Sequence, residues 1–71
     1  MRLRFTRHAI TESMPGDKIC VTEVEDAIRK SELTVKVSRK KFKFRYKDVE
    51  VVCQREKDYW LVITCYRIMP G

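Results

Sequence analysis

From residue 34 onward the chain alternates apolar and polar residues with a period of two, and this pattern constrains the fold most. Neighbouring side chains in a β-strand point to opposite faces, so the alternation is typical of strands with one buried face. The first two such segments carry these apolar residues: Val35, Val37, Phe42, Phe44 and Tyr46. Two further segments follow at residues 49–55 and 59–68. We therefore predict four strands joined by short polar connections.

Two helices are predicted before these strands. After a short strand at residues 3–5, Thr6 is a suitable N-cap for a helix that runs to about Met14 and ends before Pro15. Thr22 and Glu25 have the spacing of a capping box, which predicts a second helix through about Lys30. Its apolar residues lie on one helical face: Val24, Ala27 and Ile28.

A chain of 71 residues, 44% apolar and 37% charged, is expected to form one small globular domain over residues 1–71. Helices followed by consecutive strands predict an α+β fold, with two N-terminal helices packed on a four-stranded antiparallel sheet. The longest apolar run, residues 59–66, is too short to cross a bilayer, and residues 1–5 do not resemble a signal peptide. We expect a cytoplasmic protein with no membrane partner.

The register of the two C-terminal hairpins decides which side chains share a face. A two-residue loop at Lys47 and Asp48 aligns the large apolar residues of the first hairpin and sets Arg45 opposite Glu50. For the last hairpin, a three-residue loop at residues 56–58 directs one set of side chains to the core: Leu61, Ile63 and Cys65. The other set then shares the face of Lys43 and Arg45: Trp60, Val62, Thr64 and Tyr66. A two-residue loop reverses both sets. We prefer the first arrangement, because it places polar side chains beside the basic ones.

Positive charge is concentrated in one segment of the chain. The net charge is +6, and seven of the twelve residues at positions 36–47, here called the basic segment, are basic while none is acidic. They are Lys36, Arg39, Lys40, Lys41, Lys43, Arg45 and Lys47. Such a segment favours a polyanionic partner, most commonly nucleic acid. The alternative is a solvated hairpin whose lysines prevent edge-to-edge association.

Aromatic residues beside these cations favour single-stranded RNA, whose bases stack on rings while cations hold phosphates. Trp60 and Tyr66 are the candidate rings. The alternative for each is ordinary packing against a helix.

His8 is the one histidine, and Glu12 lies four residues later on the same helical face. Histidine transfers protons near neutral pH, and metal-independent ribonucleases need such a group together with cations at the phosphate. His8, Arg45 and Thr64 would supply these roles if the helix start packs near the last strand. The alternative is a structural or solvent-facing histidine.

Three cysteines and one histidine give no zinc-ligand spacing, so we expect neither a metal nor another cofactor. The cysteines are Cys20, Cys53 and Cys65. A reactive pair with His8 is one interpretation. Free buried thiols explain them better, because two of the three lie in apolar strand patterns.

Four short stretches resemble a family of very small bacterial and archaeal proteins: FTRHA at residues 5–9, VTEVEDAI at 21–28, VV at 51–52 and VITCY at 62–66. Members carry an R-H-A helix start, an acidic helix and a closing V-x-T-x-Y strand. The family is similar to RelE-like toxins and is grouped with barnase-type and colicin-type ribonucleases. Many relatives read R-M-x-x-R in the first helix, whereas this chain has ESMPG at residues 12–16.

The resemblance implies helices on one side of a four-stranded antiparallel sheet, metal-independent RNA cleavage and an antitoxin partner protein. Arg7, His8, Thr64 and Tyr66 match its motifs, and Arg45 matches loosely. We therefore predict a toxin-like ribonuclease with these catalytic residues: His8, Arg45, Thr64 and Tyr66. RNA contacts are predicted for Arg7, Arg39, Lys40, Lys41, Lys43, Lys47 and Trp60. The alternatives are a non-catalytic nucleic-acid-binding module and a module that binds an acidic protein.

Overall fold

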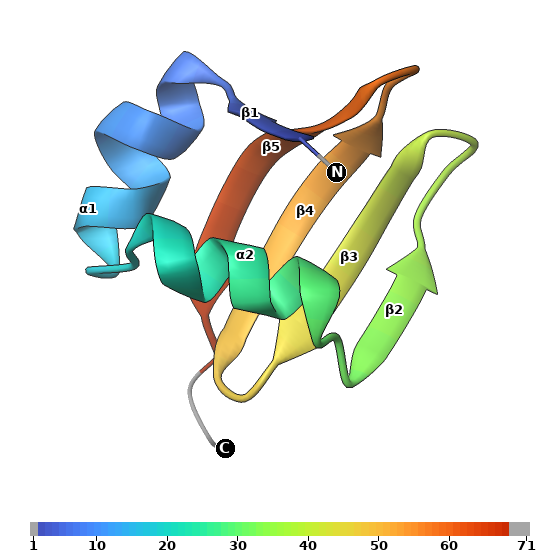
Figure 1. Ribbon diagram of the computed structural model, residues 1–71. Coiled ribbons are helices and arrows are strands. Elements are labelled where there is room, and N and C mark those ends of the chain that lie inside the picture. Colours follow the sequence, from blue (N-terminus) through green and yellow to red (C-terminus); the bar gives the residue numbers. More distant parts are fainter. Residues whose placement is uncertain (1, 69–71) are drawn as a thin grey trace.

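The structure is a computed structural model that describes residues 2–68, and its main element is one five-stranded sheet (Figure 1). The strands are β1 (Arg2–Phe5), β2 (Leu33–Lys36), β3 (Lys41–Tyr46), β4 (Val49–Arg55) and β5 (Tyr59–Arg67). Their spatial order is β1-β5-β4-β3-β2. Strands β2 to β5 form an antiparallel meander, while β1 pairs with β5 in parallel. The α+β class is confirmed.

The predicted four-stranded antiparallel sheet is wrong, because β1 adds a fifth, parallel strand. Its register sets Leu3 beside Trp60 and Phe5 beside Val62. Leu3 and Phe5 pack against the buried core from this position. The apolar residues of β1 therefore extend the covered face of the sheet. The two strands that pair in parallel, β1 and β5, are the first and the last in the chain, and all other elements lie between them in sequence.

The first helical segment, residues 7–16, begins as predicted but does not end before Pro15. The Ala9 N–H donates to Thr6 Oγ1 at 3.1 Å, so Thr6 is the N-cap. A π-helical turn, η1 (Ala9–Ser13), follows, in which the Met14 N–H donates to the Ala9 carbonyl. This wider register lets the proline, which lacks an N–H, enter the last turn, α1 (Met14–Gly16).

The second helix, α2 (Val21–Arg29), has Cys20 rather than Thr22 at its N-cap. The Glu23 carboxylate accepts a hydrogen bond of 3.2 Å from the Cys20 N–H, so the N-terminal signal is present two residues earlier than predicted. The predicted apolar stripe is confirmed, since Val24 and Ala27 are buried and Ile28 packs against the core.

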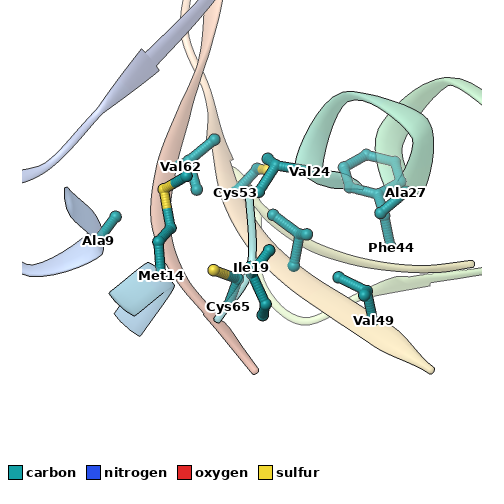
Figure 2. Packing of buried hydrophobic residues seen from close by; sticks show 11 residues of the cluster. Ala9, Met14, Ile19, Val24, Ala27, Phe44, Val49, Cys53, Val62 and Cys65 are labelled. Atoms are coloured by element: carbon teal, nitrogen blue, oxygen red, sulfur yellow. The ribbon is translucent and has the colours of Figure 1, made fainter. Parts of the chain in front are cut away.

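The helices cover one face of the sheet, and the core lies between the two layers (Figure 2). From the sheet it contains Phe44, Val49, Val51, Cys53, Val62 and Cys65, and from the helical layer Ala9, Met14, Ile19, Val24 and Ala27. The indole of Trp60 meets the rings of Phe42 and Phe44 edge-on, with centroids 5.4 and 5.1 Å apart. This aromatic cluster fixes the facing of β3 and β5.

The register of the first hairpin, β3–β4, is as predicted. Tyr46 pairs with Val49 across the loop at Lys47 and Asp48, and Arg45 pairs with Glu50.

The preferred register of the last hairpin is wrong in its first half. The Glu56 N–H donates to the Tyr59 carbonyl, and Arg55 pairs with Trp60, which leaves a two-residue loop. Trp60 and Val62 therefore point to the core and Leu61 points away from it, because burying the indole with the two phenylalanines removes more apolar surface from water. A β-bulge at Ile63 then shifts the register by one residue. Beyond the bulge, Cys65 is buried and Tyr66 faces outward, as predicted.

Candidate nucleic-acid interface

The sheet face opposite the helices, here called the open face, has no helix of residues 2–68 packed on it (Figure 1). Strand pairing brings its side chains into rows that run across the sheet. One row is Leu33, Arg45, Glu50 and Tyr66. The next begins with Val35, Lys43 and Val52. The third is Lys41, Gln54, Leu61 and Arg4. Cations, rings and apolar side chains are thus interleaved on one surface.

Three cations of the basic segment lie on alternate residues of β3 and so occupy successive rows of the open face: Lys41, Lys43 and Arg45. Same-face residues along a strand are about 7 Å apart, which is close to the spacing of successive phosphates in a single strand of RNA. Their alternation with the core residues Phe42 and Phe44 is what places all three on this side.

Arg45, Glu50 and Tyr66 form a polar cluster on the open face. The Glu50 carboxylate is only 8% exposed and lies 3.6 Å from the Arg45 guanidinium. The Tyr66 hydroxyl donates to the second carboxylate oxygen of Glu50. Arg45 Nε is buried and has no hydrogen-bond partner among the described residues. One donor of the cluster is therefore buried and unsatisfied within the described part of the chain.

Burial and the hydrogen bond to Glu50 raise the pKa of Tyr66 to about 12. The phenol therefore stays protonated at neutral pH and acts as a hydrogen-bond donor. It can donate to Glu50 or to an oxygen of a bound ligand.

The far end of the open face carries a second aromatic site. The Arg4 guanidinium lies over the ring of Tyr59, 5.0 Å from its centroid. Leu61 lies beside Arg4 in the same register. Sequence patterns alone did not assign Arg4, Tyr59 and Leu61 to this face, because their facing depends on the two-residue loop and on the pairing of β1.

His8 is separated from this surface. Its imidazole is 56% exposed and lies 3.2 Å from Glu12, on the helical segment that packs against β5. Figure 1 shows this segment at one side of the sheet and the β2–β3 hairpin at the other. The neighbouring Arg7 is exposed on the same segment. The predicted cleft shared by His8 and the basic segment is not formed, because the helical layer covers the opposite face.

Thr64 and Trp60 also differ from their predicted roles. Thr64 Oγ1 is hydrogen-bonded to Ser13 Oγ at 2.8 Å, so it joins β5 to the first helical segment. Trp60 packs with Phe42 and Phe44 on the helix side, so it does not share the open face with Lys43. The alternative interpretation, ordinary core packing, holds for this ring.

The remaining predicted RNA contacts lie in the two connections that flank β3. Arg39 and Lys40 are exposed in the β2–β3 connection. Lys47 occupies the β3–β4 turn with a φ of 57°, and its ammonium lies 5.4 Å from the ring centroid of Tyr46. These cations flank the sheet and do not join the rows of the open face.

The two cysteine thiols in the strands, Cys53 and Cys65, are buried and are not reactive nucleophiles. Burial raises the pKa of Cys53 to about 12 and also raises that of Cys65. Both thiols are therefore protonated at neutral pH, whereas Cys20 is exposed at the N-cap of α2. Residues 2–68 contain no cluster of three or more metal-ligating side chains. No helix among those residues is both long and apolar enough to cross a membrane.

Comparisons with protein-family models, with curated proteins and with solved structures found no match to this chain.

Proposed function

We propose that the chain binds single-stranded RNA across the open face of its sheet. The observation that carries the proposal is the register of β3, which sets Lys41, Lys43 and Arg45 in successive rows. Tyr59 and Tyr66 lie on the same face two strands away, where unpaired bases could stack. A single strand suits this surface better than a duplex, whose stacked bases are not available to flat rings.

Salt titration of binding to a fluorescent oligouridine tests this proposal. Lys43→Ala is expected to weaken binding and to lower the slope of log K against log salt by about 0.7, the value for one phosphate contact. Arg29→Ala is the matched control, because it removes one positive charge from an exposed position on α2. Equal weakening by both variants would show that only net charge matters and would contradict the proposal.

A second candidate function is metal-independent cleavage of the bound RNA, and the cluster of Arg45, Glu50 and Tyr66 favours it. The toxin-like ribonuclease that the family resemblance implies would then use these residues in place of His8. In this reaction Glu50 takes the proton of a ribose 2′-hydroxyl, whose oxygen attacks the adjacent phosphorus. The bond to the 5′-oxygen breaks and that oxygen takes a proton from the Tyr66 hydroxyl, which recovers one from Glu50 through their hydrogen bond. A 2′,3′-cyclic phosphate remains. Arg45 stabilises the charge that develops on the phosphoryl oxygens.

Cleavage of labelled RNA in the presence of EDTA tests this second candidate. Glu50→Gln is expected to lower the cleavage rate by about 10²- to 10⁴-fold, the range for loss of a general base. Binding of oligouridine should remain, since Lys41, Lys43 and Arg45 are unchanged. His8→Ala is the control and should cleave at the original rate. Full activity of Glu50→Gln, or loss of activity in His8→Ala, would reject this assignment.

A further inference from the structure

Strand β2 is an outer strand of the sheet, and every one of its residues is exposed. Three apolar side chains follow one another on alternate residues at this edge, and Leu33, Val35 and Val37 are 46%, 43% and 50% exposed. The other outer strand, β1, differs, because its apolar residues pack against the core. Exposed apolar edges pair readily with other chains, so natural proteins usually cover or interrupt them.

The backbone of β2 has donors and acceptors directed away from the sheet. The Val37 N–H donates to the Lys41 carbonyl at 2.8 Å. Hydrogen-bonded and non-hydrogen-bonded pairs alternate in an antiparallel ladder, and Val35 shares the parity of Val37. The peptide groups of Thr34 and Lys36 therefore point to the free edge, where a further strand would bind.

We propose that an extended segment of an acidic partner protein binds beside β2 as a sixth strand. Charge complementarity selects this occupant: Lys36 lies on the edge, and Arg39 and Lys40 follow in the exposed connection. A partner segment that alternates apolar and acidic residues would set the former beside Leu33 and Val35 and the latter beside Lys36. A second copy of this chain fits less well, because its own β2 would bring like charges together.

The partner strand is distinct from the cations of the proposed RNA site. It pairs with the free edge of β2 and its acidic side chains lie beside Lys36 on the helix side of the sheet, whereas Lys41, Lys43 and Arg45 lie on the open face. Binding of a labelled peptide that alternates valine and glutamate tests the proposal directly. The same peptide with lysine in place of glutamate tests the charge. We expect the glutamate peptide to bind at least about tenfold more tightly at low salt. Equal binding of both peptides would overturn the proposal.

Thr34→Pro removes the outward N–H without removing a bond to β3. Thr34→Val is the matched control, since both variants lose the hydroxyl that donates to Ser31 Oγ. We expect the proline variant to bind the peptide about tenfold more weakly than the valine variant. It lacks the backbone N–H that would donate to the peptide, and its ring projects from the free edge. Both variants should bind oligouridine equally, so failure of this proposal is separable from failure of the RNA proposal.

Circular dichroism establishes whether the proline variant is folded. If it is not, Lys36→Glu decides the question, and we expect it to weaken binding of the glutamate peptide and to strengthen binding of the lysine peptide. Unchanged affinity for both peptides would overturn the proposal. Sedimentation of the peptide-free protein tests the other occupant, and a dimer that Thr34→Pro abolishes would assign the edge to a second copy.

Discussion

The two faces of the sheet are made by the same strands, yet they differ in composition and cover. On the helix side, Phe44, Val51 and Cys53 lie under Val24 and Ala27 and are buried. On the open face, apolar residues are interleaved with cations and lie at the surface of the described molecule. A solvated sheet face normally alternates cleanly with polar residues. The proposed RNA site gives the apolar and aromatic groups of the open face a role that folding of the sheet does not require.

The largest expected difference between the faces is in stability. Phe44→Ala removes a buried ring that contacts Trp60 and should lower the free energy of unfolding by about 3–5 kcal/mol. That is much of the stability expected for so small a domain. Urea unfolding followed by circular dichroism measures the change. Lys43→Ala, on the adjacent residue and the opposite face, should change it by about 0.5 kcal/mol or less. Similar effects of the two variants would contradict the assignment of faces.

The next effect concerns the polar cluster of the open face. Tyr66→Phe leaves the nearly buried carboxylate of Glu50 without one donor, which should cost about 1–2 kcal/mol. The Tyr59 hydroxyl makes no hydrogen bond within residues 2–68, so Tyr59→Phe serves as the control and should be close to neutral. Equal unfolding free energies for the two variants would show that the Tyr66 hydroxyl is not a structural donor.

The same cluster has an alkaline signature. Because the pKa of Tyr66 is raised in the folded protein, this residue contributes stability below its ordinary pKa of about 10. That contribution is lost as the pH rises from about 10 to about 12. Spectrophotometric titration of the folded protein should therefore show one tyrosine that ionises near pH 12, and Tyr66→Phe should remove it. Unchanged titration in that variant would refute the assignment.

The sequence predicted the elements that depend on local patterns. The loop at Lys47 and Asp48 sets three apolar pairs on one face, and only one register achieves this. The stripe on α2 likewise follows from helical spacing. The β3 cations of the open face could therefore be predicted, because their facing follows from the same hairpin as the buried phenylalanines.

Features that depend on tertiary pairing were not predictable from patterns. Residues 3–5 gave a strand, but nothing local shows that it pairs with β5 in parallel. In a regular strand, residues i and i+3 point to opposite faces, so Val62 and Cys65 would not both be buried. The bulge at Ile63 shifts the register by one residue and turns both side chains toward the core. The distance between His8 and Arg45 depends on which face of the sheet the helices cover. Sequence spacing does not determine that face, so it could not show whether the predicted catalytic residues lie together.

A pH-dependent effect is expected on the helix side. The pKa of Glu23 is lowered, first by the hydrogen bond from the Cys20 N–H and also by Arg67, whose guanidinium lies 2.9 Å away. A lowered pKa stabilises the folded protein above the usual value near 4.5, and this contribution is lost as the pH falls through the lower, folded-state pKa. Urea unfolding at pH 7 and pH 3 should therefore show a smaller loss for Glu23→Gln than for the original chain. Asp58→Asn, in the exposed last loop, is the control, and an identical loss in all three proteins would contradict this role of Glu23.

The smallest expected change in stability concerns Lys18, in the connection between the two helical segments that cover the helix side of the sheet. The first helical segment ends in a Schellman motif, in which the Ile19 N–H donates to the Met14 carbonyl and Lys18 has a φ of 54°. Glycine is the usual residue there, because a side chain is disfavoured in the left-handed region. Lys18→Gly should therefore stabilise the fold by about 0.5 kcal/mol, whereas Lys18→Val should destabilise it. Because the change leaves both buried partners, Ile19 and Met14, in place, oligouridine binding on the open face should not change. Altered RNA affinity in a folded Lys18→Gly variant would show that the helical layer contributes to the interface and that the two faces are not independent.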